Sequence, residues 1–244
     1  MTDATGDAEN RLARIERLLE TGERDLVPAW RRATRGEPRW AVTAVILVAV
    51  ALQLMLPHRL ALQPYWALPV LELVLLAGLI AANPRRVEPR TRWLRWLGLG
   101  LISVISLANG LAALRLVGDL VSGRAGKDAV PLLLTGGGIW LTNVIVFALW
   151  YWEWDRGGPM ARALGRQQHA DFLFAQMQSP EVAPPDWEPA FLDYLYLSFT
   201  NSTAFSPTDV MPLSRWAKML MMLQSSVSLV TVVLVVARAV NILK

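Results

Sequence analysis

A run of hydroxyl and amide side chains near the C-terminus carries the groups best suited to chemistry in this sequence. The polar members are Thr200, Asn201, Ser202, Thr203, Ser206 and Thr208. Such side chains donate and accept hydrogen bonds without being charged at neutral pH. They can line a path for a solute, or they can join packed helices within a membrane. The residues alone leave both interpretations open, with Thr200, Asn201 and Ser202 as candidates to line a path.

A single acid, Glu72, interrupts the apolar run LPVLELVLL. An ionisable side chain inside a membrane is costly, so it is a functional-site hypothesis by default. Glu72 is a further candidate to line a path, where it could carry protons, or it could pair with Arg115 in a later apolar segment. It could also be a neutral acid that hydrogen-bonds a neighbouring helix. The sequence does not choose among these three interpretations.

Signatures of catalysis and of cofactor binding are missing from the sequence. The chain has no cysteine, which excludes disulfides, thiolate metal sites and cysteine nucleophiles. His58 and His169 are far apart and follow no metal-ligand pattern. The glycines at 136–138 lie in an apolar segment without the Lys-Ser/Thr of a phosphate loop, which predicts close helix packing instead. We predict no enzyme, no catalytic residues, no metal and no cofactor.

Five apolar segments must position these groups. They cover residues 40–56, 66–82, 96–117, 130–152 and 213–243. Each is near the length of about 20 residues that spans a bilayer, and tryptophans lie at their edges, as is typical of headgroup regions. The chain is 54% hydrophobic, above the usual 45–50% of soluble domains. We predict an all-α polytopic membrane protein with the lipid bilayer as its surroundings.

Basic residues lie unevenly around these segments. The regions before the first segment, between the second and third, and after the fourth carry thirteen arginines close to the apolar runs. The two other loops carry three basic residues, Arg59, Arg124 and Lys127. Positive charge in short loops favours the cytoplasm, so we predict a cytoplasmic N-terminus. The net charge of +4 thus comes from arginines beside membrane segments, and we predict no nucleic-acid partner.

The stretch SFTNSTAFSPTDVMP, residues 198–212, resembles the pore region of potassium channels. That region typically reads aromatic-Ser-Phe, then Thr-Thr-Val-Gly-Tyr-Gly-Asp, then a hydrophobic pair and proline. The spacing matches without a gap and places seven residues at the filter and the acid after it. They are Thr203, Ala204, Phe205, Ser206, Pro207, Thr208 and Asp209. The layout also resembles a family of uncharacterised bacterial membrane proteins with a domain of unknown function. The resemblance implies a multi-pass protein of the bacterial inner membrane and a homo-oligomer, by analogy a tetramer.

The filter residues depart from the potassium pattern. Ser206 and Thr208 replace the two glycines, and Pro207 replaces the tyrosine. Proline restricts φ, and serine and threonine tolerate positive φ poorly, so the carbonyl ladder of a potassium filter is not expected. The predicted function is a channel that is not potassium-selective. The alternatives are a non-conducting structural or interaction protein and a proton-coupled carrier that uses Glu72.

Four regions follow from this interpretation. Residues 1–39 form a cytoplasmic, basic N-terminal segment with an amphipathic helix over 9–20. Residues 40–152 hold four transmembrane helices, and 153–188 form a cytoplasmic linker with a surface helix near 160–177. Residues 189–244 hold the pore-loop-like segment and the final transmembrane helix. We predict six membrane segments with a short fifth over 189–205 that either crosses or re-enters. Asp193 is expected to cap that segment or to pair with an arginine.

Overall fold

The computed structural model describes residues 28–34, 36–82, 92–124, 126, 128–166, 169–204 and 209–243. The predicted amphipathic helix over 9–20 lies outside these ranges. So do Phe205, Ser206, Pro207 and Thr208 of the predicted filter region. A 3₁₀ turn, η1, covers Ala29–Arg31 just before the bundle begins.

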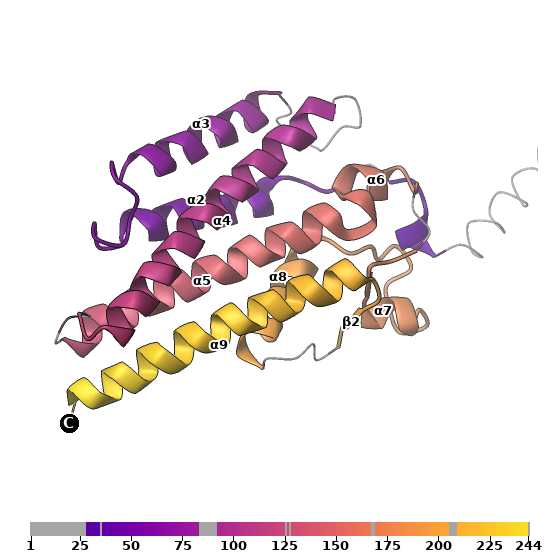
Figure 1. The fold of residues 1–244 in the computed structure, drawn as a ribbon. Coiled ribbons are helices and arrows are strands. Elements are labelled where there is room, and N and C mark those ends of the chain that lie inside the picture. The colour runs from indigo at the N-terminus through magenta and orange to yellow at the C-terminus, as the bar shows by residue number, and fades with distance from the viewer. Residues whose placement is uncertain are drawn as a thin grey trace, which may run out of the picture.

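Long helices packed side by side form an elongated bundle (Figure 1). They are α2 (Trp40–Leu54), α3 (Ala67–Ala82), α4 (Arg92–Val121), α5 (Ala129–Trp154) and α9 (Arg215–Leu243). The predicted all-α class is confirmed in its main feature. Within the described ranges, α4, α5 and α9 are long and apolar enough to cross a membrane. The length and composition of these three helices fit a helical membrane protein.

Helices α2 and α3 are shorter than the other three. They have 15 and 16 residues, or roughly 22–24 Å at 1.5 Å per residue, against a hydrocarbon core of about 30 Å. The six membrane segments predicted from the sequence are therefore not confirmed. Both helices still lie alongside the bundle, where α3 packs on α2 and α4.

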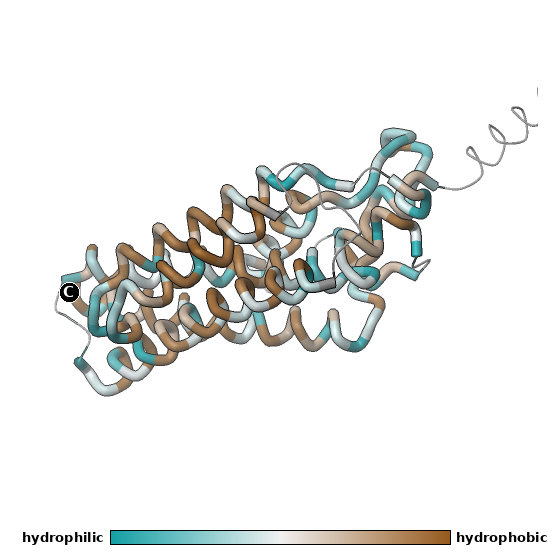
Figure 2. Tube along the Cα trace, turned by 90° about the horizontal axis from the view of Figure 1, so that it is seen from above, coloured by the Kyte–Doolittle hydropathy of each residue, from teal (hydrophilic) through white to brown (hydrophobic). Residues whose placement is uncertain are grey.

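The outer surface of the bundle is apolar. Figure 2 shows hydrophobic residues along the length of the bundle and hydrophilic residues gathered toward its ends. Leu114 of α4 and Leu134 of α5 are 69% and 72% exposed. Monomeric soluble proteins rarely expose contiguous apolar surface on this scale, whereas a bilayer solvates it. The exposed leucines thus agree with the membrane assignment.

The bundle has two chemically distinct ends. At one end Arg39 Nη1 donates to the carbonyl of Leu79 at 2.7 Å, and Arg95 Nε lies 3.6 Å from Glu153 Oε1. We call it the arginine-rich end. We call the other end the far end. There Arg115 Nη1 donates to the carbonyl of Leu60 at 3.0 Å. These contacts show that α2 and α4 begin, and α3 and α5 finish, at the arginine-rich end.

Helix α5 is the centre of the bundle and packs against α2, α4, α8 and α9. Gly136 permits its close crossing with α9. A Cβ at this position would lie 2.7 Å from Cγ2 of Val235, which leaves no room for a larger side chain. The predicted packing role of the 136–138 glycines is thus met at Gly136. A Cβ on Gly137 would meet nothing within 4 Å, so that glycine makes no comparable contact.

The segment after α5 folds back on the bundle instead of forming one surface helix. It holds η2 (Asp155–Gly157), α6 (Pro159–Ala163), β1 (Phe172–Leu173) and α7 (Ala175–Gln178). The predicted helix over 160–177 is wrong, because Gly165 has a φ of +61° and ends α6. β1 pairs antiparallel with β2 (Met211–Pro212), so that Phe172 lies opposite Pro212. The segment therefore links the end of α5 to the start of α9.

Candidate functional site: a half-length helix and its polar seam

Helix α8 (Phe191–Thr203) begins at the arginine-rich end. The Phe191 N–H donates to the carboxylate of Glu37, which also accepts the Trp152 indole N–H at 2.7 Å. Asp193 Oδ2 accepts the N–H of Ala190 at 2.8 Å, so it caps the helix, as expected for one of its two predicted roles. These contacts attach the first turn of α8 to the end of α5.

Helix α8 stops near the middle of the bundle. It has 13 residues, which is about 20 Å. Ser198 Oγ donates to the carbonyl of Val144 at 2.6 Å, and Asn201 Nδ2 donates to that of Met221 at 3.0 Å. Val144 lies within α5 and Met221 lies only six residues after the start of the 29-residue α9. In that last turn Asn201 also contacts Gln224 and Ser225, nine and ten residues after α9 begins. Helix α8 thus ends about 15 Å along α9, before the midpoint of that helix.

The chain then returns to the end from which α8 started. Trp216, in the first turn of α9, donates its indole N–H to Asp171 Oδ1 at 2.9 Å, and β2 pairs with β1 beside it. The other end of α9 packs at the far end, where Val235 and Ala239 join Leu60 and Leu116. Helices α8 and α9 therefore start at the same end and run in the same direction (Figure 1).

A hydrogen-bond network, which we call the polar seam, joins α5, α8 and α9. Gln224 of α9 is its centre and is fully buried. Its Oε1 accepts the hydroxyl of Tyr151 at 2.5 Å and the amide of Asn201 at 2.8 Å. Its Nε2 donates to Oγ of Ser198 at 2.6 Å and to Oγ of Ser202 at 2.7 Å. One glutamine thus satisfies four side chains on two other helices.

Further contacts extend the seam along α9. Ser225 Oγ donates to Oδ1 of Asn201 at 3.1 Å. Deeper in the bundle, Asn143 Nδ2 donates to Oγ of Ser228 at 3.1 Å. Buried polar groups stabilise a structure only when their partners are present, and here each of these groups has one. The seam holds α8 at one depth and in one rotation against α5 and α9.

The predicted path-lining residues divide between this seam and the surface. Asn201 and Ser202 are buried and bonded between helices. Thr200 Oγ1 donates back to the carbonyl of Tyr196 at 3.0 Å, and Thr203 Oγ1 to that of Phe199 at 2.9 Å. Thr203, Ala204 and Asp209 are exposed. Of the described predicted residues, those at the end of α8 and beyond are the ones that reach the surface of a single chain.

Glu72 lies apart from this site, on α3. It is fully buried, and the Gln53 amide of α2 is the polar group beside it. Within the described ranges its carboxyl oxygens make no hydrogen bond of standard geometry. Arg115, the other predicted partner, donates to the carbonyls of Leu60 and Ala61 instead. The pairing of Glu72 with Arg115 is thus not formed.

A charged cluster, which we call the anchor, contacts α8 through Tyr194 and was not predicted from the sequence. Its members are Asp155, Arg156, Arg162 and Asp171. Asp155 is fully buried, and its carboxylate accepts the hydroxyl of Tyr194 at 2.6 Å and the N–H of Asp171 at 3.0 Å. Arg162 Nη1 donates to the carbonyl of Trp152 at 2.6 Å. Alternating acids and bases directly after an apolar segment were the available signal, but they also fit a solvated linker.

We compared the chain with known proteins and found no relative. No family model, curated protein or solved structure matched the chain. The likeness of residues 198–212 to potassium channel pores therefore stays a resemblance carried by one short stretch, and the function has to be argued from the geometry of α8 and its surroundings.

Proposed function

We propose that this chain is one subunit of an oligomeric, pore-loop-type channel in a bacterial inner membrane. Helix α8 would be the re-entrant element, entering from the cytoplasmic, arginine-rich end. The observation that carries the proposal is the half-length course of α8, which stops at mid-depth before the chain returns to the same end. The uneven distribution of arginines supports the orientation.

The end of α8 lies open at the surface of the described part of the chain. Irregular backbone at membrane depth is tolerated only where protein buries it or where it lines a water-filled cavity. Thr203 and Ala204 form this end of the helix, and both are exposed in the single chain. They must meet either another subunit or water, and a path shared between subunits would supply both.

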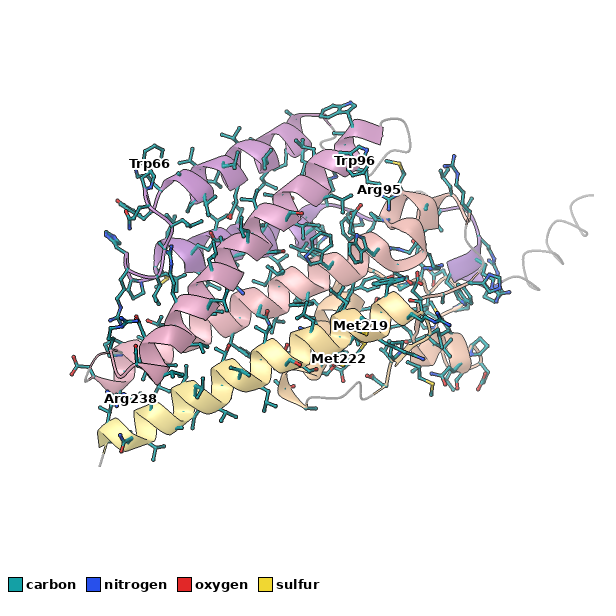
Figure 3. All side chains as sticks on the ribbon, in the orientation of Figure 1. Trp66, Arg95, Trp96, Met219, Met222 and Arg238 are labelled. Atoms are coloured by element: carbon teal, nitrogen blue, oxygen red, sulfur yellow. The ribbon has the colours of Figure 1, made fainter. Side chains whose placement is uncertain are left out.

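The apolar faces beside α8 suit contact with further subunits. On α8 itself Tyr196 and Phe199 are exposed, and on α9 Met219 and Met222 project from the bundle (Figure 3). Methionine side chains adapt readily to a neighbouring surface. We propose that copies of the chain pack through these faces around a common axis. A tetramer is the assembly expected by analogy with pore-loop channels.

The polar seam would then set the depth of α8 and would not line the path. Its amides and hydroxyls are occupied by one another, so they offer no free groups to a passing ion. The path would run past Thr203 and Ala204 at the end of α8. Because the glycines of a potassium filter are replaced, the proposed channel does not select potassium.

Cysteine accessibility tests the path directly, because the natural chain contains no cysteine. We would place Ala204→Cys protein in liposomes and treat it with a charged, membrane-impermeant thiol reagent. Reaction at residue 204, together with a fall in ion flux, is the expected result. Leu114→Cys on the outer face of α4 is the matched control and should stay unmodified. Absence of flux under all voltages, pH values and ions tried would remove the channel proposal.

The second candidate, a non-conducting structural protein, is favoured by the completeness of the polar seam within one chain. Oligomeric state separates it from a shared pore at low cost. Native mass spectrometry of the purified protein should give a defined homo-oligomer if α8 and α9 meet further copies. A monomer under all mild detergents would exclude a path between subunits and leave the structural role.

The carrier alternative depends on Glu72. That side chain is enclosed between α2 and α3, away from the end of α8. Glu72→Gln is therefore expected to leave any flux and its pH dependence unchanged in liposomes. Loss of pH-dependent transport in this variant would favour the proton-coupled carrier over the channel.

A further inference from the structure

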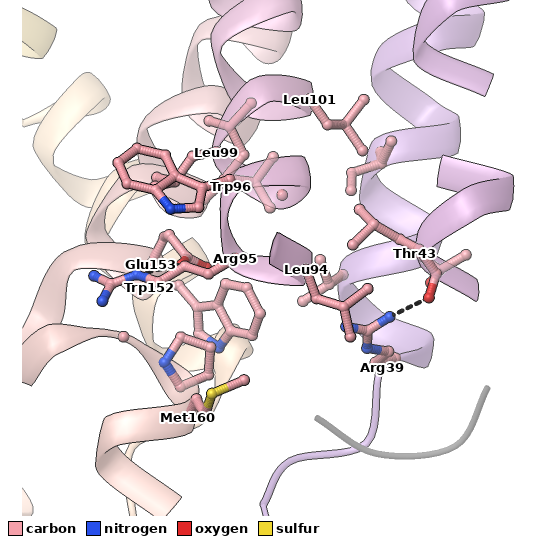
Figure 4. Close-up of a pocket in the computed structure, with 18 of the residues that line it drawn as sticks. Arg39, Thr43, Leu94, Arg95, Trp96, Leu99, Leu101, Trp152, Glu153 and Met160 are labelled. Atoms are coloured by element: carbon pink, nitrogen blue, oxygen red, sulfur yellow. Dashed lines mark hydrogen bonds and ion pairs between the residues drawn. The ribbon is translucent and has the colours of Figure 1, made fainter. Parts of the chain in front are cut away.

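A second region of the bundle has the features of a binding site. A cavity of about 790 Å³ opens at the arginine-rich end between α2, α3, α4, α5 and α6 (Figure 4). Its volume lies within the range of about 300–1,000 Å³ typical of small-molecule pockets. None of the residues of the proposed path lines it. The cavity is thus separate from the end of α8.

One part of the cavity wall is cationic. Arg39, Arg95 and Arg166 contribute three guanidinium groups, and Glu153 contributes the one carboxylate among the lining residues. Arg95 Nε lies 3.6 Å from Glu153 Oε1, and its side chain remains 45% exposed. Three positive charges against one negative charge leave an excess of two. An anionic group placed among them would meet charge-assisted donors, and arginine is well suited to phosphate.

The remainder of the wall is apolar and runs deeper into the bundle. Its deeper part is formed by Ile46, Leu76, Leu101 and Ile102, while Leu79 and Leu94 line the cavity at the level of the arginines. Trp96, which is largely exposed, stands at the cationic part of the cavity (Figure 4). Tryptophan is enriched at the depth of lipid headgroups, so the arginines lie at the same level. The cavity therefore changes from cationic to apolar along the direction of the helices.

We infer that this cavity binds an anionic phospholipid of the surrounding membrane. The phosphate would lie at the opening of the cavity that Arg39, Arg95 and Arg166 line, and one acyl chain would follow the apolar wall. Basic pockets between transmembrane helices at the cytoplasmic side are suited to anionic headgroups. A soluble phosphate would leave the apolar wall without a ligand, and a zwitterionic lipid would leave the excess charge unmatched. The cavity has both an excess of positive charge and an apolar wall. An anionic lipid has the negative headgroup and the acyl chain that match them.

A lipid in this cavity would also connect parts of the fold that share few other contacts. Arg39 precedes α2 and Arg95 lies in the first turn of α4, whereas Met160 and Ala161 belong to α6. A ligand that contacts all three segments would add stability by mass action, since it binds the folded state only. Bound lipid should therefore raise the unfolding temperature as well as register in a binding assay.

Native mass spectrometry of the full chain in detergent tests the inference. The probes are phosphatidylglycerol and phosphatidylcholine of identical acyl chains. Phosphatidylglycerol is expected to bind at least about tenfold more tightly and to raise the unfolding temperature. The double change Arg39→Gln and Arg95→Gln should remove this preference. Arg124→Gln is the matched control, because that arginine pairs with Asp119 at the far end and should leave binding unchanged.

A second pair of variants tests the acyl-chain part without altering charge. Gly98 lines the cavity, and a Cβ there would meet nothing within 4 Å, so the Gly98→Leu side chain begins in open space at the cavity wall. Gly100 lies on the same helix, also has open space at its Cβ, and does not line the cavity. Gly98→Leu should weaken phosphatidylglycerol binding about tenfold or more, and Gly100→Leu should not.

Three outcomes would overturn the inference. Equal affinity for phosphatidylcholine would remove the role of the arginines. Equal binding by the Gly98→Leu and Gly100→Leu proteins would place the lipid elsewhere. Competition by glycerol 3-phosphate as strong as that by the whole lipid would identify a soluble phosphate ligand instead. Each result is independent of ion flux, so the channel proposal and this inference can fail separately.

Discussion

The polar seam and the arginine-lined cavity both place polar groups inside a membrane protein, but they differ in what remains for a ligand. In the seam, Gln224 bonds Tyr151, Ser198, Asn201 and Ser202, and the groups enclose one another. In the cavity, Arg95 is balanced in part by Glu153 and is still 45% exposed. Saturated polar groups hold helices together, whereas unbalanced charge beside open volume can hold a ligand.

The largest effect should come from removing the centre of the seam. Gln224→Leu leaves Tyr151, Asn201 and two serines without their buried partner, and each lost buried hydrogen bond costs about 1 kcal/mol in membrane proteins. We expect a loss of roughly 2–4 kcal/mol in the free energy of unfolding. Equilibrium unfolding in mixed micelles measures it.

Ser226→Ala is the control for this change on the same helix. Ser226 is exposed and donates only to the carbonyl of Met222, so its loss should cost less than about 0.5 kcal/mol. If Gln224→Leu costs no more than this control, the seam does not hold α8, and the contrast with the cavity fails.

The next effect concerns the helix crossing that brings the seam together. Gly136→Ala would place a methyl group 2.7–3.2 Å from three carbons of Val235, and overpacking of this kind costs about 1–3 kcal/mol. Gly137→Ala meets open space and should gain helix propensity, up to about 1 kcal/mol. Thermal unfolding of both variants gives the difference, and equal unfolding temperatures would contradict the close crossing of α5 and α9.

A smaller, pH-dependent effect is expected at Glu37, which joins the first turn of α8 to the wall of the cavity. Glu37 accepts from Phe191 of α8 and from Trp152, which lines the cavity. Burial raises the pKa of the Glu37 carboxyl above its usual value of 4.5. The folded state thus keeps its proton when the unfolded state has lost it, so stability falls as the pH rises above 4.5 toward the raised pKa.

Glu37→Gln should remove this part of the pH dependence. The difference in unfolding temperature between the wild type and the variant should shift in favour of the variant as the pH rises from 4.5. Unfolding scans at several pH values measure it. A difference that is constant with pH would mean that the carboxyl titrates as it does in the unfolded chain. A difference that grows the other way would mean that folding lowers the pKa of this carboxyl.

The smallest effect on stability is expected in the cavity. Arg95→Gln removes an ion pair in which the Arg95 side chain is 45% exposed and the Glu153 side chain 8% exposed. Because the arginine is in contact with its surroundings and lies 3.6 Å from the acid, we expect a loss of about 1 kcal/mol, near the upper end of the range for surface pairs. The unfolding free energy without added lipid should therefore change little, in contrast to Gln224→Leu. A loss above about 2 kcal/mol in the free energy of unfolding would show that Arg95 stabilises the fold. The cavity would then hold helices together, as the seam does.

The apolar runs in the sequence predicted much of the fold. They did not predict which side chains the buried polar groups would bond. The apolar runs predicted the long helices, and the cap at Asp193 was among the expected roles. The role of Gln224 was not predicted, although the string QSS interrupts the last apolar segment. The position of a polar residue in a helix does not show which side chains on other helices it will bond. The anchor was missed for the same reason, since Asp155 and Asp171 meet only after the chain turns back.

The sequence by itself determined that the chain forms long apolar helices of membrane-spanning length, because the length and apolarity of a segment are local properties. It also set the positions of the arginines that distinguish the two ends. Only the tertiary structure decided that α8 stops at half depth, that Asn201 and Ser202 join helices, and that three arginines face one cavity. Those outcomes depend on contacts between residues distant in the chain, which hydrophobic period and residue spacing do not encode.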